Sequence, residues 1–301
     1  MQNKGGIFDF LSAEELNRLG RTSIGSRFTA EGMTVGAHKS RRKGVSVEFA
    51  DYRQYTPGDD IKHLDWKAYG RKERLYVREY EEETGLRVHL LVDASSSMGC
   101  SFGGVSKFRF ASTLAAAMAY IVIHNNDSAG LALFDSKCRT ILPPKNGPEH
   151  LRSLCDTLSA KTPSEKTDLA SSLHSLAEQT RRRGLIVIFS DLFDDMDKIR
   201  SALAHFRRKM HDVIVYQILD RSEIEFPFRD SARFRDPETG EMIVANPKDV
   251  RADYMAAFGN FLAECRNVCS SLGVDYQTVL TDQSPVDFLV GHSRRRALAG
   301  R

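Results

Sequence analysis

LRVHLLVDASSSM, residues 86–98, joins an apolar run to a cluster of oxygen-bearing side chains. The run 86–92 has the length and composition of a buried strand. Directly after it come Asp93, Ser95 and Ser97, a carboxylate and two hydroxyls at alternate positions. A small hard cation such as Mg²⁺ prefers oxygen ligands of this kind, at about 2.0 to 2.1 Å. The stretch therefore predicts a strand of a sheet and a candidate metal site at its end.

Two further oxygen donors are expected at the ends of other strands if the metal site is real. Thr167 follows Lys166, and Asp191 follows the apolar run LIVIFS of residues 185–190. The alternative is structural, because Asp or Ser after a strand often caps the next helix by accepting from its free amide groups. We interpret Asp168 as such a cap, and Asp194 and Asp195 as caps of a helix that begins near residue 196.

From residue 86 onward, β-like apolar runs alternate with amphipathic helical segments. This pattern predicts a three-layer α/β/α fold around a doubly wound, mostly parallel sheet. Short antiparallel hairpins are expected at the sheet edges, formed by residues 138–142 and 234–244. The expected strands are 86–92, 129–134, 185–190, 213–219 and 276–280, and the expected helices are 107–124, 148–158, 169–183, 196–209 and 247–272.

The chain is expected to divide into three parts. Residues 1–85 form an N-terminal appendage, residues 86–282 the sheet domain and residues 283–301 a C-terminal tail. The appendage opens with a capping box from Ser12 to Glu15 and is then dominated by glycine, serine and basic residues. Because it is too polar to own a large core, we expect its aromatic side chains to pack it onto the sheet domain.

At 301 residues, of which 41% are hydrophobic, the chain is long enough for one large domain and an appendage. Its net charge of +3 lacks the basic excess that is typical of nucleic-acid binding. No stretch approaches about 20 consecutive apolar residues, and the first residues lead into no signal-peptide core. We therefore expect a cytoplasmic protein without a transmembrane segment. Its five cysteines show no zinc-type pairing and fit reduced thiols.

The set Asp93, Ser95, Ser97, Thr167 and Asp191 resembles the metal-ion-dependent adhesion site of von Willebrand factor type A domains. In this resemblance the three hydroxyls offer oxygen ligands, and the two carboxylates bind the ion directly or through water. One position stays open, and a carboxylate of a partner protein can fill it. The implied ion is Mg²⁺, with Mn²⁺ or Ca²⁺ as alternatives, because oxygen ligands alone do not distinguish them.

A longer pattern extends the resemblance to a family. It comprises E-F-x-x-Y-R-x-Y-x-P-G-D-D over residues 48–60, Asp65-Trp66, and D-x-S-x-S-M over residues 93–98. Together these motifs resemble the bacterial DUF58 family, which carries a von Willebrand factor A-like domain and is typically encoded beside MoxR-type AAA+ ATPases. The resemblance implies a non-enzymatic adaptor module that works with such an ATPase, and with its client proteins, in a chaperone-like or complex-maturation system.

The motif block of the appendage has two interpretations. It can form a docking face for the ATPase, or a structural network of ion pairs and packed aromatic rings around the turn at residues 56–60. In the second interpretation Trp66, the only tryptophan, is a packing anchor. The residues concerned are Arg53, Tyr55, Asp59, Asp60, Asp65 and Trp66.

Enzyme classes fit the sequence less well than a binding module. A phosphatase with an aspartyl nucleophile would need a second carboxylate two residues after Asp93, where Ser95 stands. The glycines before Lys107 lack the spacing of a phosphate-binding loop, and no serine lies in a G-x-S-x-G elbow. The nine histidines show no paired spacing for zinc. The remaining enzyme alternative is a metal-dependent hydrolase, phosphoesterase-like, that uses Asp93 and Asp191.

Overall fold

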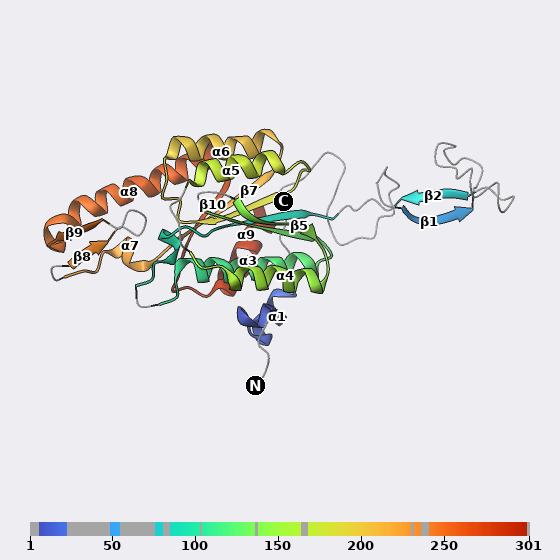
Figure 1. Ribbon diagram of the computed structural model, residues 1–301, viewed down its shortest axis with the longest axis horizontal. Helices are drawn as coiled ribbons and strands as arrows, with labels where there is room; N and C mark the ends of the chain where they lie inside the picture. Colours follow the sequence, from blue (N-terminus) through green and yellow to red (C-terminus); the bar gives the residue numbers. More distant parts are fainter. Residues whose placement is uncertain are drawn as a thin grey trace. The chain divides into compact units, whose positions relative to one another are not determined.

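The computed structural model describes residues 6–22, 49–54, 76–80, 85–102, 104–135, 138–163, 168–229, 232–235 and 241–299. The chain forms two compact units (Figure 1). The larger unit combines Met1–Phe28 with Leu86–Arg301, and the smaller unit is Thr29–Gly85. The predicted sheet domain belongs to the larger unit.

A six-stranded sheet forms the centre of the larger unit, in the order β10-β7-β6-β3-β4-β5. Five strands are parallel, and β5 pairs antiparallel with β4 as the expected edge hairpin. The chain proceeds from β3 to β4 on one side and continues to β6 on the other side, so the strand order reverses at β3. The strands are β3 (Arg87–Asp93), β4 (Ser128–Phe134), β5 (Cys138–Lys145), β6 (Leu185–Ser190), β7 (Asp212–Leu219) and β10 (Asp275–Leu280).

Helices cover both faces of this sheet (Figure 1), which confirms the predicted three-layer α/β/α fold. One face carries α3 (Lys107–His124), α4 (Pro148–Ala160) and α9 (Pro285–Ala299). The other face carries α5 (Leu169–Gln179), α6 (Met196–Arg208) and α8 (Pro247–Ser271). Within the described ranges, none of the helices combines the length and the apolar character that crossing a bilayer requires.

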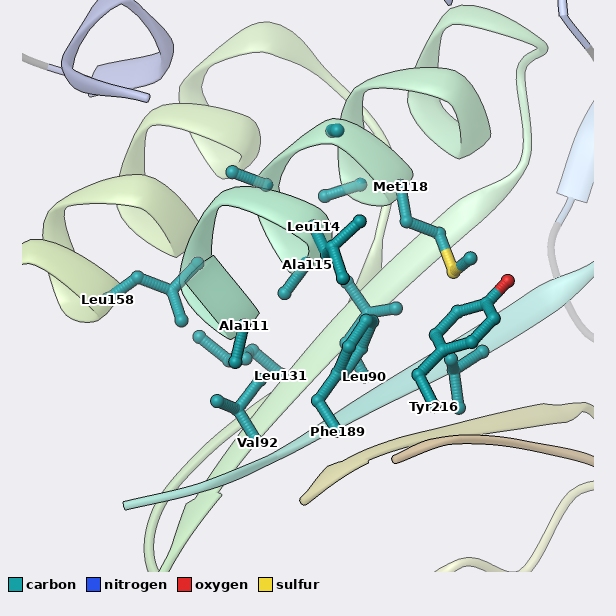
Figure 2. Close-up of a cluster of buried hydrophobic side chains, with 14 of the residues drawn as sticks. Leu90, Val92, Ala111, Leu114, Ala115, Met118, Leu131, Leu158, Phe189 and Tyr216 are labelled. Carbon is teal, nitrogen blue, oxygen red and sulfur yellow. The ribbon is translucent and has the colours of Figure 1, made fainter. Parts of the chain in front are cut away.

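Two hydrophobic cores lie on the two faces of the sheet. Figure 2 shows the first core, where Leu114 and Met118 of α3 face Leu90 and Tyr216 of the sheet. Leu91 contributes to the second core, because successive strand residues point to opposite faces. All six residues of β6 are buried, as expected for a central parallel strand covered on both sides.

The acidic residues at two helix starts act as caps. The Asp168 carboxylate accepts from the amide of Ser171 at 3.1 Å, as expected. Asp195 caps α6 through the amides of residues 197 and 198. Asp194 differs from the expectation, because its carboxylate accepts from the amide of Ala170 at 3.3 Å and so serves the start of α5.

The first residues of the chain belong to the larger unit, which differs from the expected appendage of residues 1–85. A short 3₁₀ turn, η1 (Gly6–Asp9), precedes α1 (Ala13–Leu19), and α1 begins with the expected capping box from Ser12 to Glu15. Leu16 and Leu19 of α1 are buried in the core beneath α3. The first residues join the larger unit because the two leucines would otherwise be exposed to water, and their burial is favourable.

The expected C-terminal tail is also part of the larger unit. Residues 285–299 form α9, and its Val286 and Leu289 are fully buried against the sheet. His292 and Arg296 continue the same helix face and are buried too. These four residues recur every three or four positions, so they form one side of the helix. This side covers β7 and β10 on that face of the sheet.

The second expected hairpin forms a separate sheet and does not extend the central one. The strands β8 (Ala232–Arg235) and β9 (Met242–Ala245) pair only with each other among the described strands. They follow the short helix α7 (Arg221–Glu225). Phe234 of β8 packs on the rings of Phe226 and Phe228, which explains why the hairpin folds onto this segment.

In the smaller unit, β1 (Phe49–Gln54) pairs antiparallel with β2 (Tyr76–Tyr80), and the register shifts near Phe49. Arg53 lies on β1 opposite Val77. The expected packing of this segment on the sheet domain depends on side chains that the structure does not describe. The remaining members of the candidate docking face lie outside the described residues, and they are Tyr55, Asp59, Asp60, Asp65 and Trp66.

Candidate metal site

Asp93 and Asp191 lie at the same edge of the sheet. The strands β3 and β6 are parallel neighbours, with Val92 opposite Phe189. Asp93 is the last residue of β3, and Asp191 directly follows β6. This edge is the carboxyl end of the parallel strands at the point where their order reverses, which is where open α/β sheets bind ligands.

The loop after β3 brings the two serine hydroxyls together. The Asp93 carboxylate accepts from the Ser95 amide at 2.9 Å, and the Ala94 amide donates to the carbonyl of Phe134 at 2.7 Å. A 3₁₀ turn, η3 (Ser97–Gly99), follows. The hydroxyl oxygens of Ser95 and Ser97 lie 3.0 Å apart, and both side chains are buried. Two of the predicted oxygen donors therefore converge beside the Asp93 carboxylate.

The end of β6 is tied directly to Asp93. The Ser190 hydroxyl donates to the second oxygen of Asp93 at 2.6 Å and accepts from the Leu192 amide at 3.0 Å. Leu192 has a φ of +62°, a conformation that non-glycine residues adopt rarely, and it turns the chain sharply after Asp191. The Gln217 side chain donates to the Asp191 carbonyl at 2.9 Å and fixes this turn.

Lys107 is a member of the site that the sequence analysis did not identify. Its ammonium group donates to Asp191 at 2.8 Å and to Glu223 of α7 at 2.7 Å. The side chain is only 1% exposed, and its nitrogen lies 4.8 Å from the ring centre of Phe193. A signal was present in the sequence, since a lysine at the first position of a helix opposes the helix dipole and needs a compensating anion.

Burial and neighbouring charges shift the pKa values of this cluster. Burial and then the Asp191 carboxylate raise the pKa of Asp93 to about 7. Burial alone would lower the pKa of Lys107, but Asp191 and Glu223 outweigh it and the pKa is raised. Burial also raises the pKa of Glu223, against the opposing effect of Lys107. Burial is therefore the main cause of the raised pKa values of Asp93 and Glu223.

The donor set fits a divalent cation. The carboxylates of Asp191 and Glu223 bind one ammonium group, and the buried Asp93 carboxylate interacts with Asp191, so the ionised cluster carries two negative charges in excess. One divalent ion would neutralise this excess and return the pKa of Asp93 toward its ordinary value. Carboxylate and hydroxyl oxygens are also the ligands that Mg²⁺ prefers.

Thr167, the fifth predicted ligand, lies outside the described residues, so its place at the site stays a prediction. Among the residues that the structure does describe, no group of three or more His, Cys, Asp or Glu side chains is arranged to hold a metal ion. The candidate site combines two carboxylates with hydroxyls, so it is a different kind of donor set.

Comparisons with known proteins place the chain in a family. Residues 51–260 match the family model described as "Protein of unknown function DUF58". The uncharacterized protein Rv1480 of Mycobacterium tuberculosis is 26% identical over 278 residues, which cover 90% of this chain and 87% of that protein.

Among solved structures, the conserved hypothetical protein BatB of Bacteroides thetaiotaomicron is similar at 18% identity and a TM-score of 0.47, covering 71% of this chain and 98% of that one. The SpRpn10 VWA domain is similar at 10% identity and a TM-score of 0.39, covering 69% and 95%. The match of the family model over more than half of the sequence shows that the chain belongs to the DUF58 family.

Proposed function

We propose that this protein is a non-enzymatic, metal-dependent interaction module, and that it works with a MoxR-type AAA+ ATPase in a chaperone-like or complex-maturation system. The observation that carries the proposal is the convergence of the Ser95 and Ser97 hydroxyls, 3.0 Å apart, beside a pair of buried carboxylates. The ATPase is supported by membership of the DUF58 family together with the gene neighbourhood that the resemblance implies.

In this proposal the protein holds Mg²⁺ through Ser95, Ser97 and Asp93, with Thr167 as a further ligand and Asp191 next to the ion. The ion supplies a positive centre that can accept a carboxylate from a partner protein. Lys107 keeps the Asp191 carboxylate oriented, and Ser190 does the same for Asp93. These contacts preform the site, which lowers the cost of ordering it when the partner binds.

The hydrolase alternative is less well supported by the geometry. A general base must be free to accept a proton from water or from a substrate. The Asp191 carboxylate is instead bound to the buried Lys107 ammonium group at 2.8 Å, so it is not free to take a proton from water or from a substrate. A turnover assay on phosphoester substrates with added Mg²⁺ separates the two functions, because the interaction module should give no turnover.

Replacing Asp93 tests the metal site directly. We expect Asp93→Ala to lower the affinity for Mg²⁺ by at least about 100-fold in calorimetry, since loss of even an outer partner of a metal ligand costs about 10- to 100-fold. The matched control is Asp195→Ala, which removes an exposed helix cap and about 1 kcal/mol of stability but should leave Mg²⁺ affinity unchanged. Equal Mg²⁺ affinity in Asp93→Ala and the wild type would refute the assignment.

A pull-down from the native cell, with and without chelator, tests the partner. We expect a MoxR-type ATPase to be recovered with Mg²⁺ and to be lost after chelation or in Asp93→Ala. Equal recovery with the metal stripped would leave the adaptor function but remove the metal-bridged contact. Recovery of no ATPase under either condition would remove both.

A further inference from the structure

Exposed apolar side chains are concentrated in the loops that carry the candidate metal site and in the segments that follow α7. Ten large apolar residues are exposed among those that the structure describes. Six of the ten belong to the loops after β3 and β6, to β9 or to α8, although these segments are a small part of the chain: Phe102, Val105, Phe193, Met242, Val244 and Met255. Apolar residues scattered singly need no explanation, but a group of this kind marks an interaction site.

Aromatic contacts join these segments into one structure. We define the arm as α7, β8, β9 and the first half of α8, which extend beyond the sheet in Figure 1. A series of neighbouring rings leads from the loop after β3, through the arm, to the loop after β6. Its members, with centroid separations of 4.6 to 6.4 Å, are Phe102, Phe228, Phe226, Tyr254, Phe258 and Phe193.

The arm is also tied to the metal site by polar contacts. Glu223 of α7 accepts from Lys107, which in turn holds Asp191. The Tyr254 hydroxyl of α8 donates to the Glu223 carbonyl at 2.8 Å. The exposed Phe193 lies two residues after Asp191, and its amide donates to that carboxylate at 3.3 Å. The arm and the metal site are therefore joined by direct contacts.

The hairpin of the arm presents apolar and basic side chains together. Phe234 packs inward on Phe226 and Phe228, so Arg233 and its cross-strand neighbour Val244 face the opposite side. Both are exposed, and Val244 is exposed to 71%. Apolar side chains beside an arginine complement a partner that carries both apolar and acidic residues.

We propose that Phe102, Val105 and Phe193 form an apolar rim beside the metal site, and that Met242, Val244 and Met255 continue this apolar surface along the arm. The rim binds a protein segment in which an Asp or Glu is flanked by large apolar side chains. The carboxylate reaches the ion, and the flanking side chains bury against the rim. The contact between the carboxylate and the ion rests on the proposed function, whereas the apolar contact depends only on the exposed side chains.

A random peptide library displayed on phage, selected on the full-length protein in Mg²⁺, tests this inference. We expect enriched peptides to carry an Asp or Glu flanked by large apolar residues. The double variant Phe102→Ser, Val105→Ser should weaken binding of an enriched peptide at least about tenfold, because apolar anchors dominate such interfaces. Both side chains are about half exposed in a loop and belong to neither hydrophobic core, so their replacement should leave the sheet domain folded.

The control is Leu298→Ser, a more exposed apolar residue near the end of α9. Arg296, two residues earlier, contacts the first residues of β7 and β10, so Leu298 lies at the opposite edge of the sheet from the metal site. This variant should bind the selected peptide as the wild type does. A selection without the acidic-apolar pattern, or equal binding to the double variant, would overturn the inference.

Chelation separates the rim from the proposed function. Peptide binding that is lost with chelator and in Asp93→Ala, but kept in the double variant, would leave the metal-bridged function and overturn the rim. Loss in the double variant alone would keep the rim and contradict the metal bridge. Self-association of the wild type, or its binding to phosphatidylglycerol vesicles, would reassign the rim to a second copy or a membrane if the double variant abolished it.

Discussion

At the scale of single residues, Lys107 determines the charge of the candidate site. Removing an ammonium group from water is costly, and the cost is offset only by close partners. Lys107 has two, at 2.7 and 2.8 Å, and its pKa is raised despite its burial. Because the lysine is covalently attached and cannot dissociate, it neutralises one carboxylate permanently and leaves an excess suited to one divalent ion.

Lys107→Met should destabilise the fold strongly without metal. The variant leaves Asp191 and Glu223 buried without their cation, and breaking a buried ion pair in this way costs about 3 to 5 kcal/mol. Mg²⁺ should restore part of the loss, because an ion that binds only the folded state stabilises it. Urea unfolding with and without Mg²⁺ measures both effects.

The matched control for this experiment is Lys198→Met, which removes an exposed lysine of α6 and should change stability by less than about 0.5 kcal/mol. Adding Glu223→Gln to Lys107→Met should recover part of the stability, since it removes one of the two unpaired charges. A loss below about 1 kcal/mol in Lys107→Met would show that the ion pairs contribute little.

The predictable part of the site is the part that is local in sequence. Asp93, Ser95 and Ser97 lie within five residues, and their alternate spacing alone predicts that their oxygens converge. Lys107 is 84 residues from Asp191 and 116 from Glu223, so their contacts depend on the packing of α3 and α7. No pattern in a single sequence predicts that packing. The only signal was Lys107 itself, a lysine at the first position of a predicted helix.

At the scale of elements, periodicity predicts what the backbone forms but not always where it packs. The strands and helices of the sheet domain occur close to their predicted bounds, because apolar runs and caps are local signals. In residues 285–299 the buried positions 286, 289, 292 and 296 follow a helical spacing, yet the sequence analysis predicted only a C-terminal tail over residues 283–301. The hairpin of β8 and β9 was recognised by its turn, but its partner is the aromatic segment after α7.

Two glycines test how tightly the edge strand β5 packs against β4. At Gly130 of β4, an added Cβ would lie 2.8 Å from the Pro144 nitrogen and 2.9 Å from the Leu142 oxygen. Both are backbone atoms of β5 that cannot move independently. Gly130→Ala should therefore destabilise the protein by about 1 to 3 kcal/mol, as overpacking does.

Gly259 of α8 is the matched control, because an added Cβ there meets nothing within 4 Å. Gly259→Ala should stabilise the protein by about 0.5 to 1 kcal/mol, since alanine favours a helix over glycine by that amount. The midpoints of urea unfolding compare the two variants. A stable Gly130→Ala would mean that β5 can shift away from β4 without cost.

At the scale of the whole molecule, α9 and the first residues of the chain close one face of the sheet. Beneath α9, the Tyr216 hydroxyl lies 2.7 Å from His292, and His292 lies 3.2 Å from Asp275. Arg296 donates to Asp275 and, at 2.8 Å, to Asp212, so one helix is bound to the first residues of two strands. At the surface of the protein, the exposed Arg18 side chain of α1 forms an ion pair with Asp287 of α9. Segments at the two ends of the sequence are thereby joined in one unit.

The stability that His89 contributes should be lost as the pH decreases from about 6.5 to about 4. Burial, and then the charges of His211 and Arg87, lower the pKa of His89 in β3 from 6.5 to about 4. In this window the unfolded chain binds a proton at His89 that the folded protein does not, so acid favours unfolding. The shift corresponds to about 2 to 3 kcal/mol, discounted because the ring is partly exposed.

His89→Asn removes this contribution and isolates it from the others. Near pH 8 His89 is neutral in both states, so the difference between variant and wild type gives the cost of the substitution alone. Between about pH 8 and pH 4.5 the variant should then lose about 2 kcal/mol less stability than the wild type in urea unfolding. A remaining slope is expected, because burial also lowers the pKa of His211, whereas the raised pKa of Asp93 acts in the opposite direction. Equal losses in the two proteins would show that His89 takes up its proton in the folded state as readily as in the unfolded chain.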